Sequence, residues 1–177
     1  MGERVHIVEQ ITALFGELTW YGRQLLARRV AKHGLTPPQF IVLKTLGRCG
    51  SPLTLGEIAD ALQLPASSLT SIADRLVARG LATRDAVPED RRAVALTITG
   101  EGQAVVEAVD AERRQELASL LRDAPIEDLR LFVSVLRTIS AGLERLLAGS
   151  DRQCMANIEQ LEGEGKASHG TRSSGHA

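Results

Sequence analysis

Apolar residues recur at steps of three and four along most of the chain, which is the spacing of amphipathic helices. The first such stripe predicts a long helix over residues 5–32 that ends at His33-Gly34. Its apolar positions are Ile7, Ile11, Leu14, Leu18, Tyr21 and Leu25. A second helix is expected to start at Pro37, after a cap at Thr36, and to break over residues 47–52.

Two shorter helices and a change of period follow. Thr54 and Glu57 have the spacing of a capping box at the start of a helix that ends at Leu62. The next helix is expected from residue 65 or 66 to residue 79, with Gly80 as its stop. Residues 81–87 and 92–98 then alternate loosely around a turn cluster at 88–90, which is typical of a β-hairpin. Helix, turn, helix and hairpin in this order predict a winged helix-turn-helix.

Two long helices complete the pattern, over residues 99–121 and 126–148, with Thr99 as the cap of the first. Three long apolar stripes around a small middle need a surface to bury against, so a homodimer is expected, with a monomeric bundle as the alternative. The predicted fold is mainly α with a small β-hairpin wing, a winged helix-turn-helix flanked by long dimerisation helices. The expected organisation is an N-terminal dimerisation helix (5–34), the winged helix-turn-helix (35–98), C-terminal dimerisation helices (99–148) and a Gly- and Ser-rich tail, largely disordered (149–177).

Composition narrows the class of protein. The chain has 177 residues, 44% of them hydrophobic and 24% charged, which suits a globular protein rather than a disordered one. It has no apolar run of about 20 residues and no signal-peptide pattern, so a cytoplasmic protein without membrane contact is expected. Cys49 and Cys154 make no disulfide framework. Because the net charge is −1, any binding of nucleic acid must depend on a few well-placed arginines.

The helix after the turn carries the first candidate site for DNA. The second helix of a helix-turn-helix enters the major groove with its N-terminal end, where each base pair has a distinct pattern of donors and acceptors. Small hydroxyl side chains and free first-turn N–H groups suit phosphates and base edges. The candidates are Ser67, Ser68, Thr70, Ser71 and Arg75. The alternative is that Ser67 or Ser68 merely caps the helix.

The predicted hairpin carries the second candidate. Asp90, Arg91 and Arg92 lie at its tip, where arginine on a thin wing can reach the narrow minor groove. Asp90 can hold one guanidinium in place through a bidentate pair. A solvated charged turn is the alternative, but the position directly after a helix-turn-helix favours DNA contact.

The order of these motifs resembles the MarR family of bacterial transcription regulators. The resemblance rests on residues 35–40 (LTPPQF), 53–62 (LTLGEIADAL), 67–70 (SSLT), 74–81 (DRLVARGL), 90–92 (DRR) and 96–102 (LTITGEG), and it covers about residues 5–148. It implies an obligate dimer held by the N- and C-terminal helices, with one winged helix-turn-helix in each protomer. It also implies a pseudo-palindromic operator on double-stranded DNA, read by the hydroxyl-rich helix and by the arginines of the wing. Repression is the commoner role in the family.

The resemblance further implies an effector, because many members bind small aromatic or phenolic anions that weaken operator binding. Trp20, Tyr21, Arg23 and His33 are candidates, since an aromatic pair with a cation suits an aromatic anion. The alternative places Trp20 and Tyr21 in the dimer core and Arg23 on the surface. No cysteine lies in the first helix, so peroxide sensing is not expected.

Other classes of function are less favoured. The four histidines show no paired spacing of metal ligands, and neither a metal nor a cofactor is expected. The sequence has no Gly-rich phosphate loop, His-Glu-x-x-His or Gly-x-Ser-x-Gly, so an enzyme is not expected. The remaining alternative is a winged-helix module that binds another protein without specific DNA binding.

Overall fold

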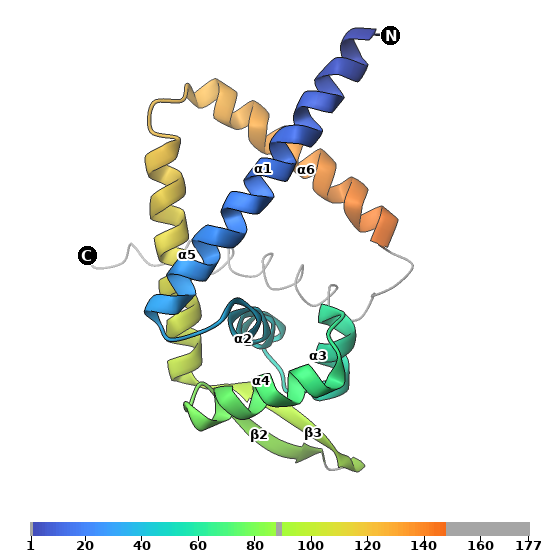
Figure 1. Cartoon of the computed structure of the whole chain (residues 1–177), viewed down its shortest axis with the longest axis vertical. Helices are drawn as coiled ribbons and strands as arrows, with labels where there is room; N and C mark the ends of the chain where they lie inside the picture. Colours follow the sequence, from blue (N-terminus) through green and yellow to red (C-terminus); the bar gives the residue numbers. More distant parts are fainter. Residues whose placement is uncertain (1, 88–89, 148–177) are drawn as a thin grey trace, which may run out of the picture.

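The computed structural model describes residues 2–87 and 90–147 (Figure 1). The elements follow in the order α1 (Gly2–Lys32), α2 (Pro37–Cys49), β1 (Leu53–Thr54), α3 (Leu55–Leu62), α4 (Ala66–Ala78), β2 (Ala82–Val87), β3 (Asp90–Ile98), α5 (Gly100–Leu120) and α6 (Ile126–Leu147). The predicted tail, with Cys154, lies outside the described residues. Within the described ranges, no helix is both long enough and apolar enough to cross a membrane.

The capping signals in the sequence are confirmed at two helices. The Thr54 hydroxyl accepts the N–H of Glu57 at 3.2 Å, and the Glu57 carboxylate accepts the N–H of Thr54 at 2.7 Å. At α5 the Thr99 hydroxyl accepts the N–H of Gly102 at 3.1 Å. These side chains satisfy N–H groups that have no partner inside their helices.

Three predicted boundaries were wrong. Helix α1 begins at Gly2, three residues before the expected start. The break expected over residues 47–52 begins later, because α2 continues through Gly47 to Cys49 and ends at Gly50, where φ is +62°. Cys49 is buried there. The second strand was expected from residue 92, but β3 begins at Asp90, which pairs with Val87 across the hairpin. Aspartate is more common in turns than in strands, but the pairing of Asp90 with β2 overrides that local preference.

The sheet contains a third strand that the sequence pattern did not predict. Leu53 and Thr54 form β1 and pair antiparallel with Leu96 and Ala95 of β3, so the strand order is β1-β3-β2. Two residues are too few to show an alternating pattern. The strand lies directly before α3 and joins the helix-turn-helix to the hairpin.

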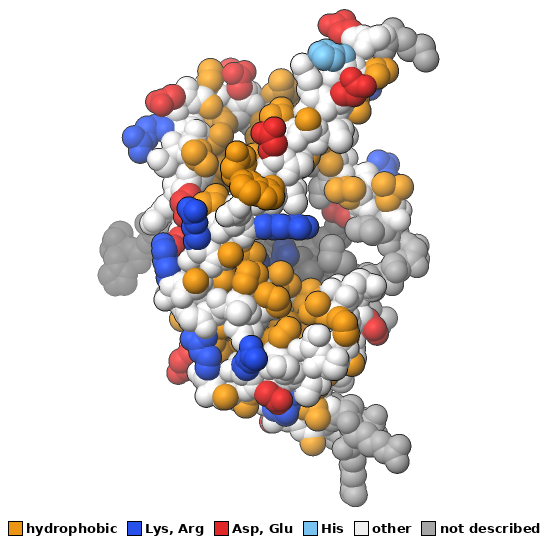
Figure 2. All heavy atoms as spheres, viewed as in Figure 1, with side chains coloured by type: hydrophobic (Ala, Val, Ile, Leu, Met, Phe, Trp, Pro, Cys, Tyr) orange, Lys and Arg blue, Asp and Glu red, His pale blue; other side chains and the backbone are white. Residues whose placement is uncertain are grey.

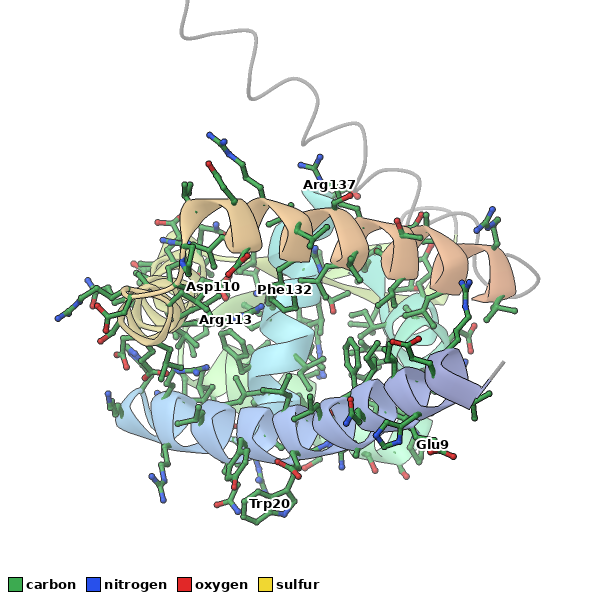
Figure 3. The ribbon with its side chains drawn as sticks, turned by 90° about the horizontal axis from the view of Figure 1, so that it is seen from above. Glu9, Trp20, Asp110, Arg113, Phe132 and Arg137 are labelled. Carbon is green, nitrogen blue, oxygen red and sulfur yellow. The ribbon has the colours of Figure 1, made fainter. Side chains whose placement is uncertain are left out.

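One hydrophobic core holds the lower lobe of the molecule together. Its largest fully buried side chains come from α1, α2, α3, α4, β3 and α5: Val30, Val42, Leu43, Leu46, Ile58, Leu69, Leu76, Leu96 and Val109. The lobe contains α2, α3, α4 and the sheet, and α5 runs out of it to the turn before α6 (Figure 1). The N-terminal part of α1 and all of α6 extend beyond the lobe, on opposite sides of the molecule in the view from above (Figure 3).

The extended helices expose much apolar surface. Leu14 and Leu18 of the α1 stripe are 56% and 61% exposed, and Leu120 near the end of α5 is 78% exposed. On α6 the exposed apolar side chains include Ile126, Leu131, Phe132, Val133, Val135, Leu136, Leu143 and Leu146. Hydrophobic side chains also gather along α1 in the space-filling view (Figure 2). Monomeric proteins rarely expose continuous apolar surface of this extent.

Candidate nucleic-acid interface

The two sides of α4 differ sharply in burial. Leu69, Ala73 and Leu76 are fully buried and pack in the core. The side chains predicted to contact DNA all lie on the other side and are exposed: Ser67, Ser68, Thr70, Ser71 and Arg75. The structure therefore brings the five candidates together on the solvent face of one helix. A helix anchored by apolar residues on one face can present the other face to a DNA groove.

The start of α4 leaves its hydroxyl groups available. The N-cap position is Pro65, with no side-chain hydrogen bond, so neither Ser67 nor Ser68 caps the helix. The Thr70 hydroxyl donates to the carbonyl of Ala66 at 3.0 Å, which leaves its lone pairs outward. Within the described part of the chain, the hydroxyls of Ser67, Ser68 and Ser71 have no partner. The free N–H groups of the first turn lie beside them.

Asp90, Arg91 and Arg92 open strand β3, next to the tip of the hairpin. They belong to a strand rather than to the turn that the sequence suggested, although they still lie at the far end of the wing from the core (Figure 1). A register shift between Ala86 and Val87 accompanies the end of regular pairing. Such shifts are common where a strand must redirect side chains.

An ion pair that the sequence analysis missed joins the wing to α4. Arg84 Nη1 of β2 lies 2.9 Å from Asp74 Oδ1 of α4. Both side chains are partly exposed, so the pair contributes little to overall stability. Its effect is geometric, because it ties two elements that would contact DNA together. The spacing of ten residues across a loop gave no local signal for it.

A second group of ion pairs joins α5 to α1 and α2. The Arg29 guanidinium, 7% exposed, donates to Glu116 Oε2 at 3.0 and 2.8 Å, and Lys32 Nζ donates to Glu112 at 2.7 Å. The hydrogen bond from Arg29 lowers the pKa of the Glu116 carboxyl below its ordinary value. The hydrogen bond from Lys32 does the same for the pKa of Glu112. A third pair, Lys44 with Asp110 at 2.7 Å, joins α2 to α5.

The candidates for effector binding are only partly brought together. Trp20 and Tyr21 form an edge-to-face pair with ring centroids 5.0 Å apart. Trp20 projects outward from α1, away from α6 (Figure 3). It shares an open groove of about 430 Å³ with Arg23, lined also by Phe15, Gly16 and Thr19.

His33 lies apart from that groove, at the corner after α1 and about 20 Å from Trp20 along the helix. Its Nε2 is 3.8 Å from Glu112 Oε1 and makes no hydrogen bond to any described group. No cluster of three or more His, Cys, Asp or Glu side chains able to hold a metal ion occurs in the described ranges.

Helices α3 and α4 form a helix-turn-helix, and the hairpin of β2 and β3 follows it as a wing. The chain is therefore a winged helix-turn-helix protein, a fold that presents one helix and one hairpin to duplex DNA.

A sequence model of the MarR family matches residues 33–93. The chain is 31% identical over 122 residues to the multiple antibiotic resistance protein MarR of Escherichia coli, covering 61% of this chain and 84% of that protein. It is 39% identical over 90 residues to the HTH-type transcriptional repressor MdtR of Bacillus subtilis, covering 51% and 57%. The chain belongs to the MarR family of transcriptional regulators.

Solved structures agree with this assignment. The crystal structure of the YusO protein from Bacillus subtilis superposes with a TM-score of 0.65 and 27% identity, covering 77% of this chain and 96% of YusO. Wild-type MarR from E. coli in its apo form gives a TM-score of 0.64 and 26% identity, covering 72% and 94%. The mainly helical architecture with a small antiparallel sheet is thus the fold of this family.

Proposed function

We propose that the chain works as a homodimer that binds a pseudo-palindromic operator on double-stranded DNA and represses transcription there. The observation that carries this proposal is the two-sided helix α4. Its buried side anchors it in the core, and its exposed side is a continuous surface of hydroxyls with Arg75 at its far end. That surface can approach DNA closely; its serine hydroxyls and Arg75 can donate to phosphates and base edges, and the Thr70 hydroxyl, which donates to Ala66, can accept from base edges.

In this proposal the wing supplies the minor-groove contact. Arg91 and Arg92 open β3 at the distal end of the hairpin, and Asp90 directly precedes them. An arginine there would enter the narrow groove, where the negative potential is strongest, and Asp90 would orient one guanidinium. The ion pair between Asp74 and Arg84 supports the proposal, because it connects the wing to α4 on the side of the lobe that carries both candidate DNA contacts.

The exposed apolar surface supports the homodimer. The stripe on α1 and the apolar face of α6 extend beyond the lobe, and Phe132 lies on the side of α6 that faces α1 (Figure 3). A second copy of the chain would cover both faces through an isologous interface. Residues 5–34 and 99–148 would then serve dimerisation, and residues 35–98 would serve DNA binding.

We include an effector in the proposal, with Trp20 and Arg23 as its binding residues. An exposed indole and a guanidinium in one groove suit a small aromatic anion. Such a ligand would release the operator only if it bound a protomer spacing that differs from the DNA-bound one. Tyr21 supports the indole from the side, and His33 would act at the corner near α5.

The alternative function is a protein-binding winged helix without specific DNA binding. It is favoured by the low net charge of the chain, and a direct binding experiment separates it from a regulator. Purified protein is titrated with DNA from its own upstream region and with an unrelated duplex, across a series of salt concentrations. A specific regulator prefers its own region by about 4 kcal/mol or more, and its affinity falls steeply with salt.

The double variant Arg91→Ala with Arg92→Ala should lose operator affinity while its oligomeric state is unchanged. Equal and weak binding of the native protein to both duplexes, confirmed by selection from whole-genome DNA fragments, would refute the proposed function. A matched double variant in α6, Arg130→Ala with Arg137→Ala, removes the same charge from a helix that lies far from the wing, and it should bind the operator as the native protein does (Figure 1).

A further inference from the structure

The C-terminal ends of α1 and α4 meet through one side chain. Arg79, the C-cap residue of α4, donates from Nη2 to the carbonyl of His33 at 2.7 Å and from Nη1 to the carbonyl of Gly34 at 2.5 Å. These carbonyls belong to the corner between α1 and α2. The guanidinium therefore connects the end of the recognition helix α4 to the end of the helix that we assign to dimerisation.

This contact requires the arginine side chain of Arg79 and the absence of a side chain at Gly34. Carbonyls at the end of a helix lack intrahelical partners and lie at the negative end of its dipole, so they attract a cation. A guanidinium presents two parallel donors in a rigid fork, which an ammonium cannot reproduce. Gly34 has φ +66°, and a Cβ there would lie 3.2 Å from Arg79 Nη2. Glycine at this position therefore adopts the left-handed backbone of the corner and leaves room for the Arg79 guanidinium.

The other side of the α1 terminus is held by α5. Arg29 pairs with Glu116 and Lys32 pairs with Glu112, in the last two turns of α1. The end of α1 is therefore held between α5 and the end of α4. A change in the angle between α1 and the lobe would therefore be transmitted to α4 through the hydrogen bonds of the Arg79 guanidinium.

We propose that Arg79 is a positioning residue that sets the spacing of the two recognition helices in the dimer, and so the spacing of operator half-sites that the protein accepts. The inference rests on the proposed function, because it requires a dimer with two copies of α4 on one operator. Arg79 acts through its hydrogen bonds to the corner rather than through a base. Its loss should therefore relax the choice of spacing more than it weakens the contacts at each half-site.

The test compares Arg79→Ala, Arg79→Lys and the control Arg114→Ala, an exposed arginine on α5 without an ion pair among the described residues. Affinities are measured for the operator, for operators with one base pair added or removed between half-sites, and for a single half-site. One base pair turns the half-sites by about 34° relative to each other. The native protein should prefer its own spacing by about tenfold or more.

Arg79→Ala should reduce this preference to about threefold or less, with half-site affinity unchanged within about twofold. Arg79→Lys should behave similarly, although it keeps the charge, and Arg114→Ala should match the native protein. An unchanged spacing preference in Arg79→Ala and Arg79→Lys would overturn the proposal. If Arg79→Ala weakened every duplex equally and lowered the salt slope by about one, Arg79 would be a phosphate contact instead.

A measurement without DNA separates this inference from the proposed function. Spin labels at Ser71→Cys in a Cys154→Ser background report the distance between the two copies of α4, with Cys49 buried. The native dimer should give one narrow distance distribution, and the Arg79→Ala dimer a broad one. A broad distribution in Arg79→Ala together with no operator preference in the native protein would sustain the positioning role and refute the DNA-binding function. Equally narrow distributions would refute the positioning role.

Discussion

Gly102 of α5 lies against Leu81, in the short segment between α4 and β2, and its replacement by alanine gives a sharp test of this junction. Gly102 is buried in the first turn of α5, where its N–H donates to the Thr99 hydroxyl. An added Cβ would overlap the Leu81 carbonyl oxygen and lie 2.9 Å from Ile98 Cγ1. Backbone must move to relieve the overlap, because a carbonyl oxygen cannot rotate away as a flexible side chain can.

The expected cost follows from what must shift. The Leu81 carbonyl accepts the N–H of Thr99 at 3.1 Å, so moving it weakens a hydrogen bond worth about 1 kcal/mol. Overpacking of a close-packed core adds about 1–3 kcal/mol. The better helix propensity of alanine returns at most about 1 kcal/mol. Gly102→Ala should therefore lower the free energy of unfolding by roughly 1–3 kcal/mol, and Tm by roughly 3–10 °C.

Gly100→Ala is the matched control, because it lies two residues earlier in the same turn and a Cβ there meets nothing within 4 Å. It should be neutral, or more stable by up to about 1 kcal/mol. Both variants and the native protein are unfolded in urea at one protein concentration, with circular dichroism at the helix band as the signal. If Gly102→Ala were as stable as Gly100→Ala, the close packing of α5 on the end of α4 would be refuted.

Three further predictions test other parts of the structure. The pKa of Glu116 in the folded protein is lower than its ordinary value of 4.5. The ionised Glu116 carboxylate therefore stabilises the folded protein above pH 4.5, and this stabilisation is lost as the pH falls through the folded pKa. Glu116→Gln should therefore be less stable than the native protein at pH 7, and urea unfolding should show this difference shrinking at pH 3; a constant difference would contradict it. Leu18→Glu places a charge in the α1 stripe and should shift sedimentation from dimer to monomer, while Glu17→Gln on the same helix should not. Trp20 is the single tryptophan, so an aromatic carboxylate that binds in the groove should change the fluorescence of the protein. Quenching that saturates in the native protein and is absent in the Arg23→Ala variant would support the effector site.

The helices and the wing could be predicted from local signals. The capping residues Thr54 and Thr99, and the glycines that end α1 and α4, act within a few residues of their own position. Such signals are legible in one dimension because they depend on backbone groups close in sequence. The division of α4 into a buried and an exposed side follows equally from its 3.6-residue period.

The contacts that place the site could not be predicted in this way. Arg79 meets the carbonyls of His33 and Gly34 across 46 and 45 residues, respectively, and Arg29 meets Glu116 across 87. No local pattern distinguishes an arginine that bonds a distant carbonyl from one that faces solvent. Strand β1 was missed for a related reason, since its two residues are strand only because β3 lies beside them.

Helix α5 also has the proportions of a lever. Its 21 residues correspond to a rod of about 31 Å that begins in the lobe after Thr99 and is paired with α1 at Glu112 and Glu116, beyond its midpoint. Tilting such a rod by about 6° at its base moves its far end by about 3 Å, which is close to the rise of one base pair along DNA. If the proposed dimer binds two operator half-sites, a small rotation where α5 meets α1 would thus be enough to shift a lobe by one base pair relative to its half-site.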